Sequence, residues 1–253
     1  KELFRMKNVT LKDVAKAAGV SYATVSRALS GSSQIGSETR ERVLKLCDEM
    51  GYTTNFVARS MVTKRTNLIG LVVPSVDNQF MSELAYHAEV SARSHGYNIM
   101  LCDSGPDLRQ EKTVVKLLLG RQVDGILIIP QSPRSYESLK PYLDQTPTVF
   151  LSENLRDQPQ SYVAVDNSRG TYLGTQYLYE LGHRDILYFG QRPGSTTHQL
   201  RADGYMKACH EFNLTPHFFN SEYSRSSIQG GYQLAKELFR NCLLYTSPSP
   251  RDA

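Results

Sequence analysis

The sequence predicts a small all-α unit followed by a larger α/β region built from two lobes. Between Thr10 and Met61 the apolar residues recur only with helical spacing. From Leu68 onward, short β-branched runs alternate with amphipathic segments, which is typical of a mostly parallel sheet covered by helices. The length of 253 residues, 40% of them apolar, is enough for a small domain joined to a larger one.

The helical unit contains the pattern of a helix-turn-helix. Thr10 is expected to cap a first helix that Gly19 ends, and Ser21 is expected to cap a second helix directly afterwards. The first helix has a single apolar face, formed by Leu11, Val14, Ala15 and Ala18. Ser37 is expected to start a third helix, which runs from Glu38 to Met50. We assign residues 8–54 to this unit.

The α/β region is predicted to contain seven strands. They are the runs 68–74, 97–102, 125–130, 148–152, 162–166, 185–190 and 217–220. Helical segments lie between most of them, at 79–95, 108–121, 168–181, 198–212 and 226–240. In such alternating folds, ligands collect outside the carboxyl ends of the strands. A stretch with linker composition divides the region into a first lobe, 66–158, and a second lobe, 159–241.

Charge is distributed unevenly along the chain. Residues 1–65 hold 12 Lys and Arg against 6 Asp and Glu, a net charge of +6, whereas the remainder has a net charge of −2. An excess of basic residues at one end is the electrostatic pattern of a region that binds a polyanion. The same charge also fits an ordinary solvated helical face, so it does not by itself decide for nucleic acid.

The second helix of the helix-turn-helix has an inward and an outward face. At about 100° per residue, the inward face holds Val25, Ala28 and Leu29. The outward face holds Ala23, Ser26 and Arg27, with Tyr22 at its edge. Arg27 has the two donors that recognise O6 and N7 of a guanine, and the hydroxyls of Ser21, Thr24 and Ser26 suit phosphate oxygens. A generic helical hairpin with a solvated arginine is the alternative.

Several stretches of the sequence resemble one family of proteins, in the family's own order and spacing. They are VTLKDVAKAAGVSYATVSRALSG (9–31), TRERV (39–43), TNLIGLVVPSVDNQF (66–80), VDGILI (123–128), VAVDN (163–167), LGHRDILYFG (181–190) and RADGY (201–205). The family is that of the lactose-repressor, or LacI-type, transcription factors. The resemblance implies a DNA-binding headpiece, a hinge helix and a two-lobed sensor similar to periplasmic sugar-binding proteins. It also implies a homodimer on a palindromic operator, repressing carbohydrate-use genes under the control of a sugar or sugar derivative.

The resemblance assigns DNA contacts in the headpiece. Its base-reading positions are Tyr22, Ala23 and Arg27. Relatives often carry a polar side chain where this chain has Ala23, which leaves only a methyl contact, for example to thymine. Phosphate contacts are expected from Thr10, Ser21, Thr24, Ser26 and Asn55.

Residues 55–65 match the hinge helix and linker of the family. Val57, Ala58 and Met61 are expected in the minor groove, and Met61 stands where relatives usually insert a leucine. An apolar wedge at that point partly unstacks a base step and kinks the duplex. A helix this short is unstable by itself, so without DNA the segment is expected to be a plain linker.

The resemblance also places an effector site at the carboxyl ends of the strands. Family members usually read Asn-Pro-Phe-Phe after the first strand, whereas this chain has Asn78, Phe80 and Met81 there, with one aromatic ring replaced. Arg201 matches the family's effector-gripping arginine, although a structural role for it stays open. Weaker candidates are Gln131, Ser132, Ser195 and Thr197.

The sequence gives little support for a metal site, an enzyme or a cofactor. Asp124, Asp166 and His183 also match the family and are assigned to turns and packing. The four cysteines have no paired spacing, which predicts reduced thiols and no metal site. Because no GxxxxGK[ST], GxGxxG, GxSxG or HExxH motif is present, neither an enzyme nor a cofactor is expected.

The sequence favours a cytoplasmic protein without a membrane partner. It has neither a secretory signal nor an apolar run of about 20 residues. A sugar-binding transport protein of the same sensor fold is an alternative, but it would carry a secretory signal and no headpiece.

The end of the chain departs from the preceding helical pattern. Residues 242–253, CLLYTSPSPRDA, resemble the translated read-through of a sequencing adapter, with a genuine Pro/Ser-rich tail as the alternative. Chains of the family continue further and close both lobes. The resemblance therefore implies incomplete lobes, with sheet edges and apolar surface left uncovered.

Overall fold

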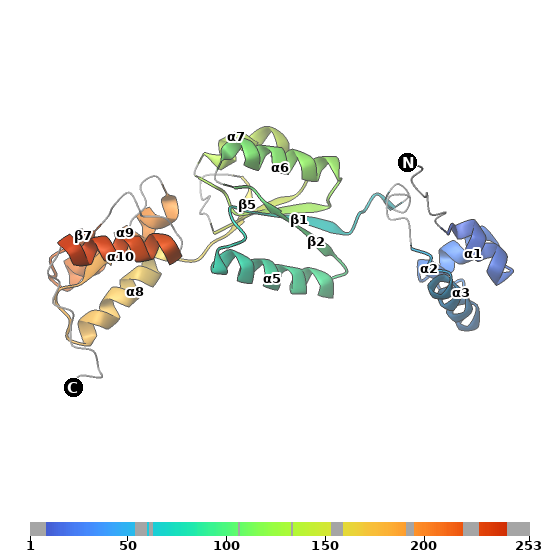
Figure 1. Ribbon diagram of the computed structural model, residues 1–253, viewed down its shortest axis with the longest axis horizontal. Coiled ribbons are helices and arrows are strands. Elements are labelled where there is room, and N and C mark those ends of the chain that lie inside the picture. Colours follow the sequence, from blue (N-terminus) through green and yellow to red (C-terminus); the bar gives the residue numbers. More distant parts are fainter. Residues whose placement is uncertain are drawn as a thin grey trace. The chain divides into compact units, whose positions relative to one another are not determined.

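The computed structural model describes residues 9–53, 60, 63–105, 107–132, 134–152, 159–190, 195–219 and 228–241 of the chain. Two compact units are present, Lys1–Thr66 and Asn67–Ala253 (Figure 1). The first unit is helical, and the second is built from alternating strands and helices. This is the predicted order of an all-α unit followed by an α/β region. The predicted tail, 242–253, lies outside the described residues.

Three of the described helices lie in the first unit: α1 (Leu11–Ala18), α2 (Tyr22–Leu29) and α3 (Ser37–Glu49). Thr10 caps α1, because its hydroxyl oxygen accepts the backbone N–H of Asp13 at 3.3 Å. The Asp13 carboxylate in turn accepts the N–H of Thr10 at 2.9 Å. Gly19, with a φ of 65°, ends α1 in the left-handed region, and Ser21 caps α2. The predicted caps at Thr10 and Ser21 and the predicted end of α1 at Gly19 are therefore confirmed.

The first residue of α3 lies one position before the predicted Glu38. Gly36 occupies the N-cap, and no side chain hydrogen-bonds to the cap. Ser37 is instead the first residue of the helix. Glycine is nearly as acceptable as threonine at an N-cap, so the serine is not needed there.

The three helices meet around a small apolar core. Val14, Val25 and Val43 contribute one fully buried side chain from each helix. The remaining buried members are Ala15, Ala18, Ala28 and Cys47. The predicted inward positions of α2, Val25 and Ala28, are thus confirmed. Short side chains allow these short helices to pack closely while the opposite face of α2 stays in solvent.

The second unit contains two parallel sheets. Their strands are β1 (Leu68–Val73), β2 (Asn98–Asp103), β3 (Gly125–Ile128), β4 (Thr148–Leu151), β5 (Ser161–Val163), β6 (Leu187–Phe189) and β7 (His217–Phe219). Five strands form a sheet in the order β2-β1-β3-β4-β5, and β6 pairs with β7. All of these pairings are parallel. The seven predicted strands are therefore confirmed, with somewhat different bounds.

β5 belongs to the first sheet, although the second lobe is predicted to begin at residue 159. Its Tyr162 lies opposite Phe150 of β4. The chain therefore leaves this sheet only after Val163. Val163 and Val165 are 64% and 65% exposed, so apolar side chains are uncovered beside this outer strand of the described sheet.

Helices cover both faces of the five-stranded sheet. The helices of the second unit are α5 (Gln79–Ser94), α6 (Leu108–Gly120), α7 (Ser135–Leu143), α8 (Asn167–Glu180), α9 (Thr196–Glu211) and α10 (Ile228–Asn241). Figure 1 shows α5 along one face of the sheet, and α6 with α7 along the other. α7 was not among the predicted segments. It begins without a side-chain cap and contains Pro141, so it lacks the usual local signals.

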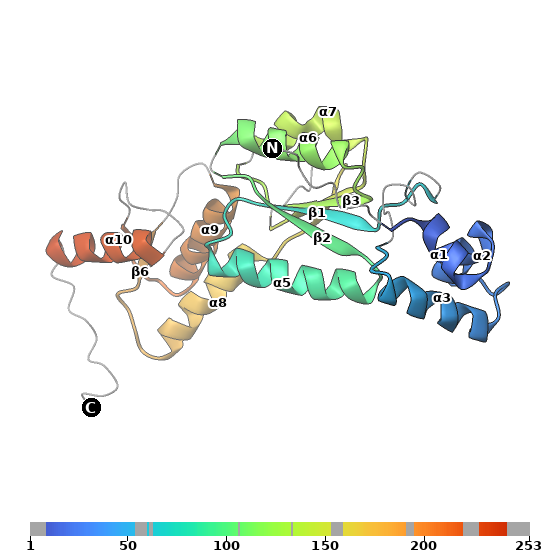
Figure 2. The ribbon, with the colours of Figure 1, turned by 45° about the vertical axis from the view of Figure 1, so that its right-hand side comes forward.

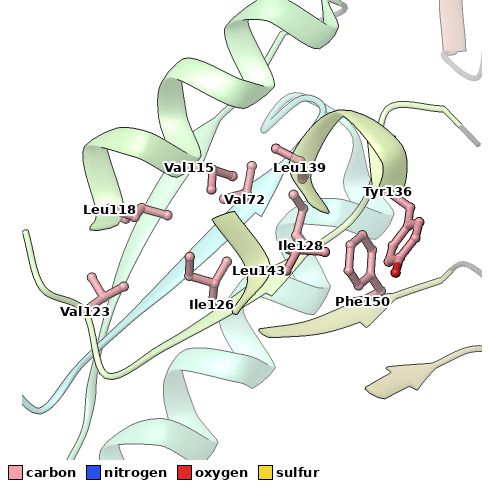
Figure 3. Close-up of a cluster of buried hydrophobic side chains, with 10 residues drawn as sticks. All are labelled: Val72, Val115, Leu118, Val123, Ile126, Ile128, Tyr136, Leu139, Leu143 and Phe150. Carbon is pink, nitrogen blue, oxygen red and sulfur yellow. The ribbon is translucent and has the colours of Figure 1, made fainter. Parts of the chain in front are cut away.

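Successive residues of β1 enter opposite cores, because side chains alternate along a strand. Val72 packs with Ile126 and Phe150 in the cluster that α6 and α7 cover (Figure 3). Leu71 and Val73 belong to the other cluster, against which side chains of α5 pack. Both faces of β1 are thus buried, which explains why its sequence contains no polar residue.

Tyr205 of α9 connects α9 to both strands of the second sheet. Its hydroxyl group donates to the carbonyl of Ile186 at 2.6 Å and accepts the N–H of His217 at 2.8 Å. Ile186 directly precedes β6 and His217 begins β7. Burial raises the pKa of Tyr205 to about 12, although the His217 N–H acts in the opposite direction.

Gly204 allows α9 to approach α8 closely, and the two helices lie side by side (Figure 2). A Cβ atom at Gly204 would lie 2.0 Å from the carbonyl oxygen of Ser168 and 2.8 Å from its carbonyl carbon. Both are backbone atoms at the start of α8, so they cannot move aside as a side chain can. The helix crossing therefore requires glycine at this position.

We expect Gly204→Ala to lower the free energy of unfolding by about 1–3 kcal/mol or more, because α8 and α9 must separate. Urea unfolding followed by circular dichroism measures the change. Gly174→Ala is the matched control, since a Cβ there meets nothing within 4 Å. It should stabilise the helix by up to about 1 kcal/mol. Equal effects of the two substitutions would contradict the proposed packing requirement.

Candidate functional site

The outward face of α2 carries the three predicted base-reading residues. Tyr22 is 55% exposed at the start of the helix, and Ala23 and Arg27 are exposed beyond it. Within the described part of the chain, the Arg27 guanidinium has no hydrogen-bond or ion-pair partner. Ser26 is exposed beside it. The donors that guanine recognition requires are therefore available.

The predicted phosphate contacts of Thr10, Ser21 and Thr24 lie at the amino ends of α1 and α2. Ser21 Oγ accepts the N–H of Thr24 at 3.1 Å and lies 2.9 Å from Thr24 Oγ1. The amino end of a helix carries partial positive charge, which favours a phosphate. Capping thus holds these hydroxyls at the helix ends, where the Thr10 hydroxyl also donates to the Asp13 carboxylate at 2.7 Å. The other candidates, Asn55, Val57, Ala58 and Met61, lie outside the described residues.

Arg40 has a structural role that the sequence pattern did not reveal. Its Nη2 donates to the carbonyl oxygen of Ser32, in the segment that joins α2 to α3. Its Nε is buried and has no partner among the described residues. The positive charge of Arg40 is therefore used inside the unit, whereas Lys12, Lys16 and Arg42 are exposed. No local periodicity signals such a contact.

The candidate effector residues follow strands that are neighbours in the sheet. Asn78 follows β1, and Gln131 and Ser132 follow β3, whereas Asn167, which is not one of the candidates, follows β5 of the same sheet. The strands are parallel, so their carboxyl ends lie along one edge. The fold therefore places segments distant in sequence along the edge where α/β proteins bind ligands.

The residues after β1 have three different environments. Asn78 caps α5, because its Oδ1 accepts the N–H of Met81 at 3.3 Å. Phe80 is 53% exposed, so its ring is available to a ligand. Met81 packs against the buried cluster of Leu71 and Val73. Of the two apolar candidates, only Phe80 is largely exposed to solvent.

Glu111 holds the segment after β3, which carries Gln131 and Ser132. This fully buried side chain accepts the N–H of Gln131 at 2.9 Å and the hydroxyl of Ser135 at 3.1 Å. Burial raises the pKa of Glu111, while the two hydrogen bonds act in the opposite direction. Ser132 Oγ accepts the N–H of Arg134 at 3.1 Å. Glu111 is thus a supporting residue that motif and periodicity did not identify.

The amino end of α9 brings three further candidates into place. Ser195 caps the helix by accepting the N–H of His198 at 3.4 Å. Thr197 Oγ1 donates to the carbonyl oxygen of Ser152, directly after β4, at 3.3 Å. Arg201 is exposed, and its Nε donates to Asn167 Oδ1 at 2.8 Å. The structure thus connects α9 to residues that follow β4 and β5.

The matched residues assigned to turns have that role. Asp124 Oδ2 accepts the N–H of Asn67 at 3.0 Å, before β1. Asp166 caps α8 by accepting the N–H of Arg169 at 2.9 Å. His183 donates its backbone N–H to Leu178 after the end of α8. These assignments are confirmed.

Among the residues that the structure describes, no group of three or more His, Cys, Asp or Glu side chains is placed to hold a metal ion. None of the described helices has both the length and the apolar character that crossing a membrane requires.

Comparison with known families places both units. The family model described as "Bacterial regulatory proteins, lacI family" matches residues 10–55. A second family model, described as "Periplasmic binding proteins and sugar binding domain of LacI family", matches residues 66–242, which is more than half of the chain. The chain belongs to the LacI family of bacterial regulatory proteins. The resemblance and the predicted fold class are thereby confirmed.

Relatives of this LacI-family chain are longer than it is. The HTH-type transcriptional regulator RegA of Clostridium saccharobutylicum is 36% identical over 207 residues, which cover 81% of this chain and 62% of RegA. DegA of Bacillus subtilis is 32% identical over 232 residues, which cover 90% of this chain and 69% of DegA. The chain thus spans only part of the length of each relative.

Solved LacI-family structures resemble the fold described above. The lac repressor dimer bound to operator and the anti-inducer ONPF has a TM-score of 0.80 and 28% identity, over 93% of this chain and 71% of that one. The CelR–cellobiose complex has a TM-score of 0.55 and 26% identity, over 91% and 71%. The first similarity extends over nearly all of this LacI-family chain.

The buried carboxyl of Glu111 should make the stability of this LacI-family chain depend on pH. Its pKa is raised in the folded state, so unfolding releases a proton between the ordinary glutamate pKa and the raised value. Stability therefore falls as pH rises through that window. Glu111→Gln keeps an acceptor and cannot ionise. We expect its free energy of unfolding, relative to wild type, to increase as the pH rises from the ordinary glutamate pKa through that window.

Urea unfolding at a series of pH values measures this difference. Glu137→Gln removes a carboxyl from the exposed side of α7 and should retain the pH dependence of the wild type. The same pH dependence in wild type and Glu111→Gln would show that Glu111 does not titrate as described.

Proposed function

We propose that this chain is a sequence-specific DNA-binding transcription regulator, a repressor of carbohydrate-use genes that a sugar-like effector controls. The observation that carries the proposal is the outward face of α2, with Tyr22, Ala23 and Arg27 exposed on a helix-turn-helix. This unit precedes a domain of the sugar-binding type, so one chain combines a DNA reader with a sensor.

DNA recognition divides between two sets of residues. Arg27 and Tyr22 read base edges in the major groove, and Ala23 offers a methyl contact. Thr10, Ser21, Thr24, Ser26 and Asn55 contact phosphates and set the position of α2 in the groove. Val57, Ala58 and Met61 form the minor-groove part of the hinge. The net charge of +6 on residues 1–65 makes binding strongly dependent on salt.

Recognition of the effector takes place at the carboxyl edge of the first sheet. Phe80 stacks on the apolar face of a sugar, while Arg201 and Asn78 bind its hydroxyl groups. Gln131, Ser132, Ser195 and Thr197 line the same edge, and Met81 supports it from the core. The CelR structure contains cellobiose, which supports a sugar as the effector class. The effector acts on operator binding only through its different affinities for two conformations.

The remaining parts of the proposal follow from this role. The chain acts as a homodimer on a palindromic operator, as the lac repressor dimer on its operator suggests. A regulator of this kind works in the cytoplasm and needs no cofactor. We also infer that it is not an enzyme, since the relatives that it matches are transcription regulators.

Substitution of Arg27 tests direct readout. An operator is first selected from random-sequence DNA with the full chain. Arg27→Ala should then lose about 1–3 kcal/mol of binding free energy on that operator and much less on random DNA, because a base contact is removed. Arg42→Ala is the matched control, since it removes the same charge from the exposed side of α3 and should weaken both complexes equally. Equal losses with Arg27→Ala would assign Arg27 to phosphate.

Addition of sugars tests the sensor. We expect one sugar from a panel of xylose, glucose, lactose and cellobiose to change operator affinity by about 1–3 kcal/mol. Arg201→Ala should weaken binding of that sugar at least about tenfold, because the hydroxyl contacts are lost. It should leave operator affinity without sugar unchanged. Calorimetry and DNA titration measure the two quantities, and unchanged sugar affinity in Arg201→Ala would exclude the proposed position of the site.

A further inference from the structure

Arg201 is exposed but anchored at one point. Its Nε donates to Asn167 Oδ1 at 2.8 Å, across 34 positions of sequence. Asn167 is only 7% exposed. A guanidinium has five N–H donors in a fixed plane, and this bond uses the one on Nε. None of the described residues accepts a hydrogen bond from the four donors of the two terminal nitrogens, which remain for another partner.

The acceptor itself is held in one orientation. Asn167 Nδ2 donates to the carbonyl oxygen of Val165 at 3.3 Å, so a flipped amide would turn an oxygen toward that carbonyl. The backbone N–H of Asn167 donates to the same carbonyl at 2.9 Å, and its own carbonyl accepts the Thr171 hydroxyl at 3.1 Å. These bonds place Asn167 Oδ1 toward Arg201.

The distance between the two residues depends on Gly204, one helical turn beyond Arg201. A Cβ at Gly204 would overlap the backbone of Ser168, the residue next to Asn167. The missing side chain thus allows α9 to approach the amino end of α8. In the sequence RADGY, Arg201 supplies the N–H donor. Gly204 sets the distance at which Asn167 can accept this hydrogen bond.

We propose that Asn167 is a positioning residue for the effector. It fixes the plane of the Arg201 guanidinium so that the two terminal nitrogens face a ligand with two neighbouring oxygens, such as a vicinal diol of a sugar. A side chain already ordered before binding loses less conformational freedom when the ligand arrives. This inference rests on the proposed function of Arg201 and adds the residue that orders it.

Two measurements on the full chain test the inference, with Asn167→Ala, Asn167→Asp and Arg201→Ala. The first is exchange of the Arg201 Nε proton with water, followed by NMR and assigned by its loss in Arg201→Ala. In the wild type this proton should exchange at least about tenfold more slowly than those of exposed arginines. Asn167→Ala should remove the protection, and Asn167→Asp, which keeps an acceptor, should retain it.

The second measurement is calorimetry with xylose, glucose, lactose and cellobiose. Asn167→Ala should weaken binding about three- to tenfold, less than Arg201→Ala, because the guanidinium remains but is no longer ordered. Asn167→Asp should bind within about threefold of the wild type. Gln176→Ala breaks a hydrogen bond to Glu180 on the surface of α8, the helix that begins with Asn167. It should change neither the exchange rate of the Arg201 Nε proton nor the affinity for the sugar.

The outcomes separate this inference from the proposed function. If Arg201→Ala abolishes sugar binding and Asn167→Ala does not weaken it, Arg201 binds the effector but Asn167 does not position it. A wild-type Arg201 proton that exchanges as fast as those of exposed arginines overturns the inference even if Asn167→Ala fails to fold. If no sugar of the panel binds the wild type, the proposed effector class is wrong, and so is a role for Asn167 in holding Arg201 for a sugar.

Discussion

Parallel pairing of β1 with both β2 and β3 is the constraint on which the first lobe depends. A strand paired on both sides and covered on both faces must be apolar throughout, as Leu71, Val72 and Val73 illustrate with no exposed surface. Parallel order also sends every carboxyl end to one edge. Polar residues that follow the strands, among them Asn78 and Asn167, therefore lie along that edge. No local sequence pattern indicates that they share it.

The first unit holds α2 in place with a small core, while the outward face of this helix stays exposed. Three valines and four smaller buried residues hold α1, α2 and α3 together. Two of the helix starts are fixed by hydroxyl caps at Thr10 and Ser21, which stabilise the termini by about 1 kcal/mol each. The same hydroxyls lie at the positive ends of helices. Under the proposed function, the atoms that stabilise these helix ends are also the atoms that contact phosphate.

A similar double use occurs at the edge of the sheet. Asn78 and Ser195 cap helices, Thr197 contacts the backbone after β4, and Asn167 anchors Arg201. Each side chain is held by a hydrogen bond within the fold, and under the proposed function this order lowers the entropy lost when the effector binds. Gly204 shows the reverse case, in which a missing side chain determines where a neighbouring functional group lies. The position of Arg201 at the edge therefore depends on how α8 packs against α9.

The sequence by itself determined the order of the two units, the helix-turn-helix with its caps, the inward face of α2 and the seven strands. These features depend on periodicity and on hydrogen bonds between residues a few positions apart, so local residues carry them. Only the tertiary structure decided that β5 joins the first sheet, that Glu111 supports the segment after β3, and that Asn167 meets Arg201. These contacts join distant residues, and their energy comes from burial and helix packing that no short stretch of sequence contains.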